Sequence, residues 1–186
     1  GAVVAGRNFA NKLWNIARYV QDQIGDNHVV APLEPRTSAD HWIIRQINSA
    51  ADAVERQLVD YRFSEAADTV YHLVWNDLAD WYVEASKINT NRPILSWALA
   101  SCLQIVHPFM PFVTETIWQT LNYTTGILMA DRWPTPNEYD DISAEQFERL
   151  KELVTEGRWV ITELPGNQKY KLLFGNDSLI EQNQDL

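Results

Sequence analysis

The chain of 186 residues has little of what would fix a fold covalently or build a catalytic centre. Its single cysteine, Cys102, excludes an internal disulfide and suits a reducing compartment, so we expect a cytoplasmic protein. None of its seven glycines belongs to a phosphate-binding loop. There is no Ser/His/Asp pattern and no histidine–cysteine cluster at metal-ligand spacing. We therefore expect no catalytic residue, no metal and no cofactor in this chain itself.

A long apolar run is also missing. Residues 93–114 contain no charged residue, but His107, Gln104 and three prolines interrupt them. No uninterrupted stretch approaches the roughly 18 residues that a membrane-spanning helix needs. The segment therefore predicts buried core helices and no membrane partner. The start lacks the layout of a signal peptide, and both ends resemble cuts through a longer protein.

Basic residues are outnumbered, with 15 Lys and Arg against 25 Asp and Glu, for a net charge of −10. Phosphate neutralisation supplies most non-specific affinity for nucleic acid, so an acidic chain is a poor general binder. The charge is unevenly distributed. Residues 1–24 hold three basic residues and one acidic residue, whereas the remainder holds 12 basic and 24 acidic ones. The first helix is the only net-positive element that we predict.

Residues 63–87 form the segment around which the rest is organised. Apolar residues recur there at steps of three and four, which predicts one long helix with a buried stripe: Phe63, Ala67, Val70, Val74, Leu78, Trp81 and Ala85. Ser64 is the expected cap, and Asn89 and Pro93 end the helix. Such a stripe needs partner helices along its length, so we expect the spine of a bundle. Its polar edge carries Asp77, Asp80, Glu84 and Lys87, flanked by Trp81 and Tyr82.

The other segments complete a mainly α fold, an antiparallel helical bundle. We expect helices at residues 4–24, from 38 to about 61, from 93 to a corner at 107–111, from 113 to 121, and one opened by a Ser143–Gln146 capping box. Thr37 and Asp40 should cap the second helix. Residues 169–174 read as a strand, the start of a truncated small α/β appendage. The predicted domains are 1–135, the helical bundle, and 136–186, the appendage.

The first helix carries two stripes. Phe9, Leu13, Ile16, Val20 and Ile24 should be buried, while Asn8, Lys12, Asn15 and Tyr19 share another face, with Arg7 and Asn11 beside them. Asparagine costs a helix roughly 0.5 kcal/mol, so a cluster of three away from the helix ends needs a reason. One reading is a solvated face with internal hydrogen bonds. The other is a row of amides, cations and a ring that awaits a polar, planar partner.

Three segments, in this order and spacing, resemble the helical anticodon-binding domain of the valyl-tRNA synthetases, a class I family. They are GRNFANKLWN at 6–15, DWYVE at 80–84 with Lys87, and HPFMPFVTE at 107–115 with Trp118. FSEAA at 63–67 and MADRWP at 129–134 also fit. The corner segment is shared with isoleucyl and leucyl relatives, and the first segment favours valine. The likeness covers 1–135 well and 143–186 loosely.

The resemblance implies that this chain grips the anticodon loop of tRNA(Val), while absent catalytic and editing domains of a parent enzyme use ATP, magnesium and valine. The HIGH and KMSKS signatures that bind ATP are missing here. Arginine and lysine suit phosphate, asparagine suits adenine, a carboxylate suits the cytosine amino group, and aromatic rings suit stacking. The tRNA-binding residues we expect are Arg7, Asn8, Lys12, Asn15, Tyr19, Trp81, Glu84 and Lys87. A monomer is expected.

Two departures from the family pattern stand out. Ala79 replaces a usual cysteine, and GRW at 157–159 stands where the family tends to have an arginine-rich segment, so we assign no role to the tail. Two alternatives remain open: the same domain of an isoleucyl- or leucyl-tRNA synthetase, or a helical scaffold that binds proteins through its apolar rim. Binding that weakens steeply with salt would favour RNA over apolar docking.

Overall fold

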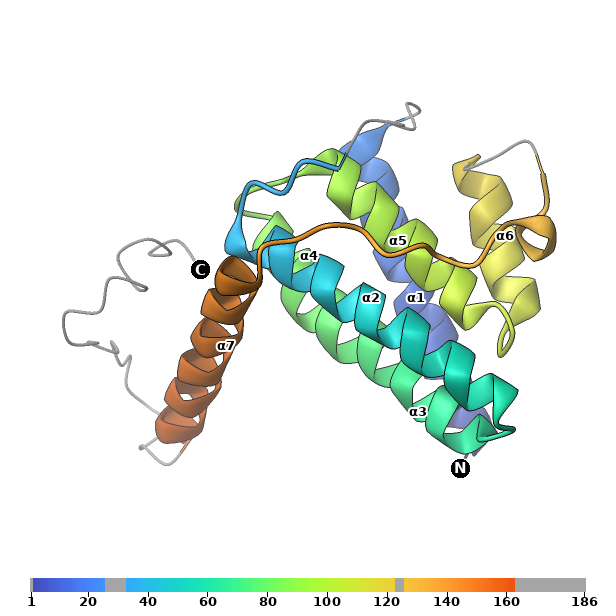
Figure 1. The fold of residues 1–186 in the computed structure, drawn as a ribbon, viewed down its shortest axis with the longest axis horizontal. Helices are drawn as coiled ribbons and strands as arrows, with labels where there is room; N and C mark the ends of the chain where they lie inside the picture. The colour runs from blue at the N-terminus through green and yellow to red at the C-terminus, as the bar shows by residue number, and fades with distance from the viewer. Residues whose placement is uncertain (1, 26–32, 123–125, 163–186) are drawn as a thin grey trace.

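The computed structural model describes residues 2–25, 33–122 and 126–162, which form helices and connecting segments without a strand (Figure 1). The elements in chain order are α1 (Ala2–Ile24), α2 (Ser38–Val59), α3 (Phe63–His72), η1 (Leu73–Tyr82), α4 (Val83–Ser86), α5 (Arg92–Val106), α6 (Pro111–Leu121), η2 (Leu128–Ala130) and α7 (Asp141–Thr162). The predicted helical bundle is confirmed. The strand predicted at 169–174, and with it the α/β appendage, lies outside the described residues.

The apolar face of α1 is as predicted. All five residues of its stripe are buried: Phe9, Leu13, Ile16, Val20 and Ile24. Because they recur at steps of three and four, they lie on one side of the helix and can pack together against α5. The polar residues of α1 are left on the remaining faces.

Helix α2 begins at the predicted capping box. The Thr37 hydroxyl accepts from the backbone N–H of Asp40 at 3.1 Å, and the Asp40 carboxylate accepts from the N–H of Thr37 at 3.2 Å. Asp40 is only 1% exposed and also accepts from the Tyr82 hydroxyl at 2.8 Å and from the Asn91 amide at 3.0 Å. One buried carboxylate thus joins the start of α2 to the spine and to α5. At the other end, the spacing of apolar residues predicts that Tyr61 belongs to the buried face of the helix; this is wrong, because Tyr61 is 80% exposed.

The spine comprises α3, η1 and α4, and it runs antiparallel to α2 (Figure 1). Its middle part, η1, is π-helical: the N–H of Val83 donates to Leu78 O, five residues back. A π-helix turns more slowly than an α-helix, so the buried positions shift along the sequence. Neighbouring pairs are therefore buried in successive turns: Leu73 and Val74, Leu78 and Ala79, Tyr82 and Val83.

Three predictions for the spine are corrected by the structure. Phe63 is 56% exposed and Ala67 is exposed too, so the buried stripe begins at Ala66 and not at Phe63. Tyr82 is fully enclosed and not part of the polar edge. The Ser64 cap is wrong as well, because α3 already begins at Phe63 with no side-chain cap. A stripe read at 3.6 residues per turn cannot follow a segment whose period changes.

Helix α5 is the most enclosed helix, as predicted, with Leu95, Ala98, Cys102 and Ile105 completely buried. The predicted corner follows it and leads into α6. His107 packs there, with its Nδ1 at 2.8 Å from the Thr114 hydroxyl. His107 thus has a structural role at this corner.

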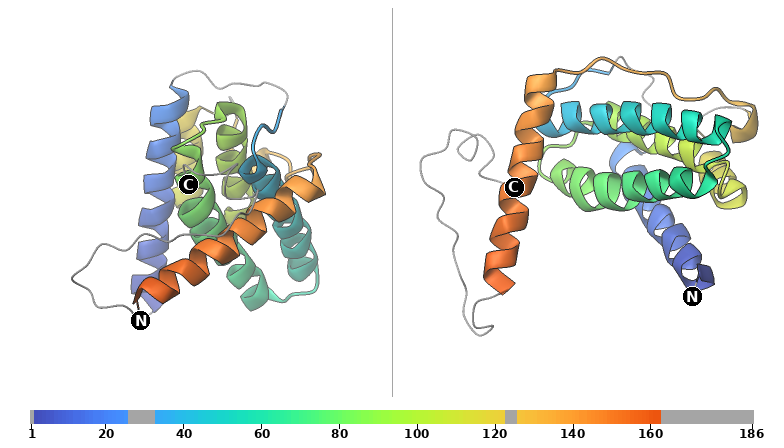
Figure 2. Two further views of the ribbon diagram at one scale, coloured as in Figure 1. Left: turned by 90° about the vertical axis from the view of Figure 1, so that its left-hand side faces the viewer. Right: turned by 60° about the horizontal axis from the view of Figure 1, so that its bottom comes forward.

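Helix α7 crosses the end of the bundle and packs mainly against α2, as the views from the side and from below show (Figure 2). Ala144, Phe147 and Leu150 form its buried face. The Ser143–Gln146 capping box was wrong. Instead, the Asp140 carboxylate accepts from the N–H of Ser143 at 2.7 Å, so the helix begins earlier, at Asp141.

Candidate nucleic-acid interface

The polar face of α1 lies along the spine, and we call this line of contact the α1 seam. Lys12 Nζ is 2.9 Å from Asp80 Oδ1, and the Tyr19 hydroxyl is 3.1 Å from the Ser86 hydroxyl. The residue numbers of both segments increase in the same direction between these two contacts, so α1 and the spine run parallel here. We expected the amide-rich face of α1 and the Trp81–Tyr82 end of the spine to border a groove wide enough for unpaired nucleotides. The α1 face does lie beside the spine, but Tyr82 is enclosed, and side chains of the two segments bond across the line between them.

Aromatic rings line the first part of the seam. Tyr71 stacks on Trp75 with centroids 5.4 Å apart and planes 13° apart, and on Phe9 at 5.7 Å. Lys12 Nζ lies 5.1 Å from the centroid of Trp75, a cation–π distance. We did not predict Tyr71 or Trp75 as part of the site. Their four-residue spacing on a helix was the available signal.

Three of the expected residues on α1 are exposed. The side chains of Arg7, Asn8 and Asn15 form no hydrogen bond or ion pair with any residue that the structure describes. Their amide and guanidinium groups therefore face solvent with donors and acceptors available. An unpaired arginine on a helix of an acidic protein is a local attraction for phosphate.

Glu84 and Lys87 lie at the other end of the seam, on the last turn of the spine. Lys87 Nζ donates to Glu84 Oε1 at 2.6 Å, and both side chains are about half exposed. An ion pair this open to water contributes little to stability and can exchange for a ligand at small cost.

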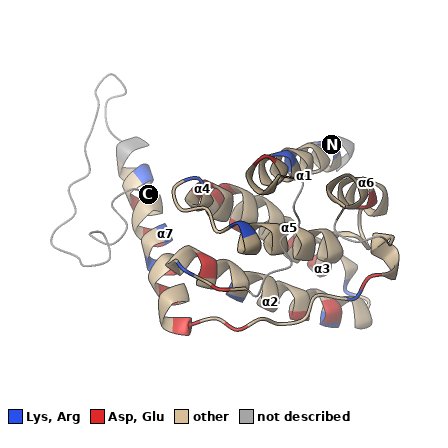
Figure 3. Cartoon of the chain, turned by 90° about the horizontal axis from the view of Figure 1, so that it is seen from above, with Lys and Arg blue, Asp and Glu red and all other residues tan. Residues whose placement is uncertain are grey.

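Trp81 does not join the α1 seam. Its ring meets Phe147 edge-on at 6.5 Å, with the Arg158 guanidinium 5.5 Å from its centroid. Both partners belong to α7, so the structure places Trp81 on the α7 side of the spine. Figure 3 shows how the two sides separate, with α7 across one end and α1 along the other flank.

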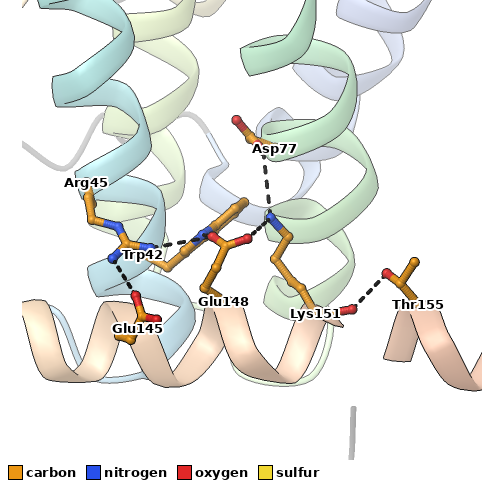
Figure 4. Close-up of polar contacts among 7 residues, drawn as sticks. All are labelled: Trp42, Arg45, Asp77, Glu145, Glu148, Lys151 and Thr155. Carbon is orange, nitrogen blue, oxygen red and sulfur yellow. Dashed lines mark hydrogen bonds and ion pairs between the residues drawn. The ribbon is translucent and has the colours of Figure 1, made fainter. Parts of the chain in front are cut away.

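A second polar cluster attaches α7 to the bundle (Figure 4). Its centre is Lys151, whose Nζ is 3.1 Å from Glu148, 4.0 Å from Asp77 and 4.1 Å from the Trp42 ring centroid. Glu148 also accepts from the Trp42 indole N–H at 2.5 Å. We call these residues the Lys151 cluster.

Burial raises the pKa of Asp77 from 3.8 to about 6, against the attraction of Lys151. The Glu148 carboxylate is also desolvated, yet hydrogen bonds from Trp42 and Lys151 hold its pKa below its usual value. The two carboxylates share one lysine at the contact of α7 with the bundle. Asp80 is not part of this cluster, since its partner is Lys12 of α1.

Two further observations limit the chemistry. Within the described ranges no group of three or more His, Cys, Asp or Glu side chains is placed to hold a metal ion. None of the helices described here is long and apolar enough to cross a membrane. What the described surface offers is recognition chemistry: amides, exposed cations and aromatic rings along a single seam.

Comparison with known proteins identifies the class. Residues 40–170 match the family described as "Anticodon-binding domain of tRNA ligase". The match covers more than half of the chain, and the chain belongs to this family. The particular enzymes it resembles are valine–tRNA ligases.

Among the relatives is the valine–tRNA ligase of Thermotoga maritima, 34% identical over 191 residues, which are 97% of this chain and 22% of the relative. The valine–tRNA ligase of Petrotoga mobilis is 35% identical over 206 residues, 100% of this chain and 24% of the relative. That of Geobacillus kaustophilus is 33% identical over 176 residues, 87% and 20% respectively. The chain thus spans less than a quarter of the length of these relatives. The predicted resemblance to the valyl family, over the isoleucyl and leucyl ones, is confirmed.

Proposed function

We propose that this chain recognises the anticodon loop of tRNA(Val) through the α1 seam, as part of a valine–tRNA ligase. The observation that carries the proposal is the contact of α1, whose three basic residues outnumber its single acidic one, with the polar edge of the spine, at Lys12–Asp80 and Tyr19–Ser86. Loop bases of RNA are unstacked, so they can lie across such a surface, stack on rings and present their edges.

The contacts suggest a division of roles along the seam. Arg7, exposed and unpaired, takes a phosphate, and Lys12 takes another once it leaves Asp80. Asn8 and Asn15 each offer a side-chain amide whose donor and acceptor match the edge of adenine. Tyr19 presents a ring that its hydrogen bond to Ser86 holds in place.

At the far end of the seam, Glu84 accepts from the amino group of cytosine, and Lys87, its present partner, turns to phosphate. In this proposal Trp81 does not contact the tRNA and acts only by positioning the spine. Its ring packs on α7 and fixes the spine from which Glu84 projects.

The parent enzyme would supply the rest. We propose that it is a cytoplasmic, monomeric ligase whose catalytic domain uses ATP, magnesium and valine, and whose editing domain removes wrong amino acids. This chain would position the tRNA for both domains. The net negative charge of the chain then favours selectivity, because it repels nucleic-acid phosphates in general while one local basic patch attracts them.

The test is binding of the chain to a transcript of tRNA(Val) and to the same transcript with its second anticodon base exchanged. We expect weak binding to the first and a loss of most of it with the second. Equal affinity for both transcripts would contradict the proposed site. A protein-binding scaffold would show neither the discrimination nor a steep dependence on salt.

Two variants separate the proposed roles. Lys12→Ala should weaken all tRNAs about equally and lower the slope of log affinity against log salt, because a phosphate contact carries no sequence information. Glu84→Ala should mainly relax discrimination at the base it contacts, by roughly 1–3 kcal/mol. If both variants lose affinity and discrimination to the same extent, the roles are wrongly assigned.

A further inference from the structure

A polar pocket of about 270 Å³ lies where the start of α2, the end of the spine and the start of α7 meet. It is lined by residues of all three elements: Arg36, Thr37, Ser38, Ala39, His41, Ala85, Ile88, Asn89, Ser143 and Gln146. In Figure 1 this is the corner at which α4, the beginning of α2 and the beginning of α7 converge. The proposed anticodon contacts do not use it.

Side chains, and not helix ends, provide the free hydrogen-bonding groups here. The first turn of α2 is already capped by Thr37 and Asp40, and that of α7 by Asp140. By contrast, the guanidinium of Arg36 and the amides of Asn89 and Gln146 have no hydrogen bond or ion pair within the described part of the chain. A cation and two amides thus line one cavity without a side-chain partner among the residues that the structure describes.

The imidazole of His41 adds another donor. Its Nδ1 accepts from the backbone N–H of Asp140 at 3.0 Å, so the neutral ring carries its hydrogen on Nε2. Two carboxylates lie at its edge, Asp40 and Asp140, and both accept hydrogen bonds from neutral groups only, which engage their oxygens without adding positive charge. In the lining itself, Arg36 supplies a positive charge, and the amides and hydroxyls are neutral donors and acceptors.

The pocket continues the proposed anticodon surface. Ile88, 40% exposed on its rim, follows Glu84 by one turn, and the backbone of Asn89 still bonds to Ala85. The pocket therefore adjoins the Glu84 end of the proposed surface along the chain.

We propose that this pocket holds one nucleotide of the loop next to the anticodon triplet, its phosphate on Arg36 and its base edge on Asn89 and Gln146. Amide side chains suit base edges because they offer a donor and an acceptor side by side, and arginine suits phosphate. The inference rests on the proposed function. It adds a contact outside the triplet, which would strengthen binding of every tRNA whose loop has the right shape.

The test uses the full chain and the tRNA(Val) transcript, with two variants that report different contacts. Arg36→Gln should weaken binding about 5–10-fold and lower the salt slope by about 0.7–0.9, the value for one phosphate contact. Gln146→Ala should weaken binding about 2–5-fold with an unchanged salt slope. Arg56→Gln is the matched control, because Arg56 is an exposed arginine near the other end of α2, and it should change nothing.

A cross-link locates the contact directly. Cys102 is buried, so Ile88→Cys provides a single accessible thiol for a photoreactive label. We expect cross-links to a nucleotide flanking the triplet, whereas cross-links confined to the acceptor arm would overturn the inference. So would wild-type affinity and salt slope for both pocket variants while Glu84→Ala still relaxes discrimination. If the wild-type chain ignores the anticodon altogether, it is the proposed function that fails.

Discussion

The α1 seam and the Lys151 cluster use the same kinds of residue and differ in burial. Each has a lysine between a carboxylate and a tryptophan ring. Lys151 and Asp77 are only 13% and 21% exposed in their side chains, whereas Lys12 and Asp80 are 31% and 49% exposed. In the Lys151 cluster, desolvation makes each charge depend on its partner. In the α1 seam, water can replace either partner. Burial therefore decides which cluster holds the fold together and which is available to a ligand.

The tryptophans show the same difference. Trp42 donates its indole N–H to Glu148 and lies under Lys151, and Trp81 packs on Phe147 of the same helix. Both rings are committed to the attachment of α7. On the seam, Trp75 lies under Lys12 and beside Tyr71, which is 42% exposed. Rings that remain open to solvent are the ones on which a base could stack.

The largest expected effect is that of Lys151→Met. The variant keeps the aliphatic stem and removes the charge, leaving Asp77 and Glu148 close together in a packed interface without their cation. Removing one partner of a buried ion pair typically costs about 3–5 kcal/mol, and partial exposure here reduces that to about 2–3 kcal/mol. Urea unfolding measures the change. Lys87→Met, the exposed control, should cost less than about 0.5 kcal/mol.

Asp77→Asn should have a smaller effect of the opposite sign. The pKa of Asp77 is about 6 in the folded chain and 3.8 in the reference state, so the folded form holds its proton more tightly. Its stability contribution therefore rises as the pH falls through 6, and above pH 6 the ionised, desolvated carboxylate costs stability.

The amide removes that cost. We expect Asp77→Asn to raise the free energy of unfolding by about 1–3 kcal/mol at pH 7.5, and the gain to fade towards pH 4. Unfolding curves at several pH values measure it. A gain that is constant with pH would show that Asp77 does not titrate in this range, and it would weaken the contrast between the two clusters.

How far the sequence leads can be seen from particular elements. The stripe of α1, the capping box of α2 and the enclosure of α5 all follow from regular helical periodicity and local hydrogen bonding, and all are confirmed. The spine was harder. Its π-helical middle, Leu73–Tyr82, changes the helical period, so Tyr82 was misplaced. Phe63 and Ala67 lie in the α-helical part before it, where the buried face was assigned to the wrong residues.

The site shows the same limit. The amide-rich face of α1 could be read from the spacing of Asn8, Lys12 and Asn15 alone. The partners of Lys12 and Tyr19 could not, because Asp80 and Ser86 are far away in sequence and only the parallel packing of α1 on the spine brings them together. Trp81 illustrates the converse: the sequence grouped it with Glu84 and Lys87, but its ring packs on α7, and where α7 crosses the bundle cannot be read from local spacing.

The smallest expected effect is on the stability of seam variants, and it gives the sharpest contrast. Lys12→Ala removes an exposed ion pair and a cation–π contact, and Glu84→Ala removes a surface pair, so each should change the free energy of unfolding by less than about 1 kcal/mol. The same variants should nevertheless alter tRNA affinity or discrimination. Thermal unfolding with the binding assay tests this pairing. If a seam variant loses stability and tRNA binding in proportion, the seam is a structural contact, like the Lys151 cluster, and not a binding surface.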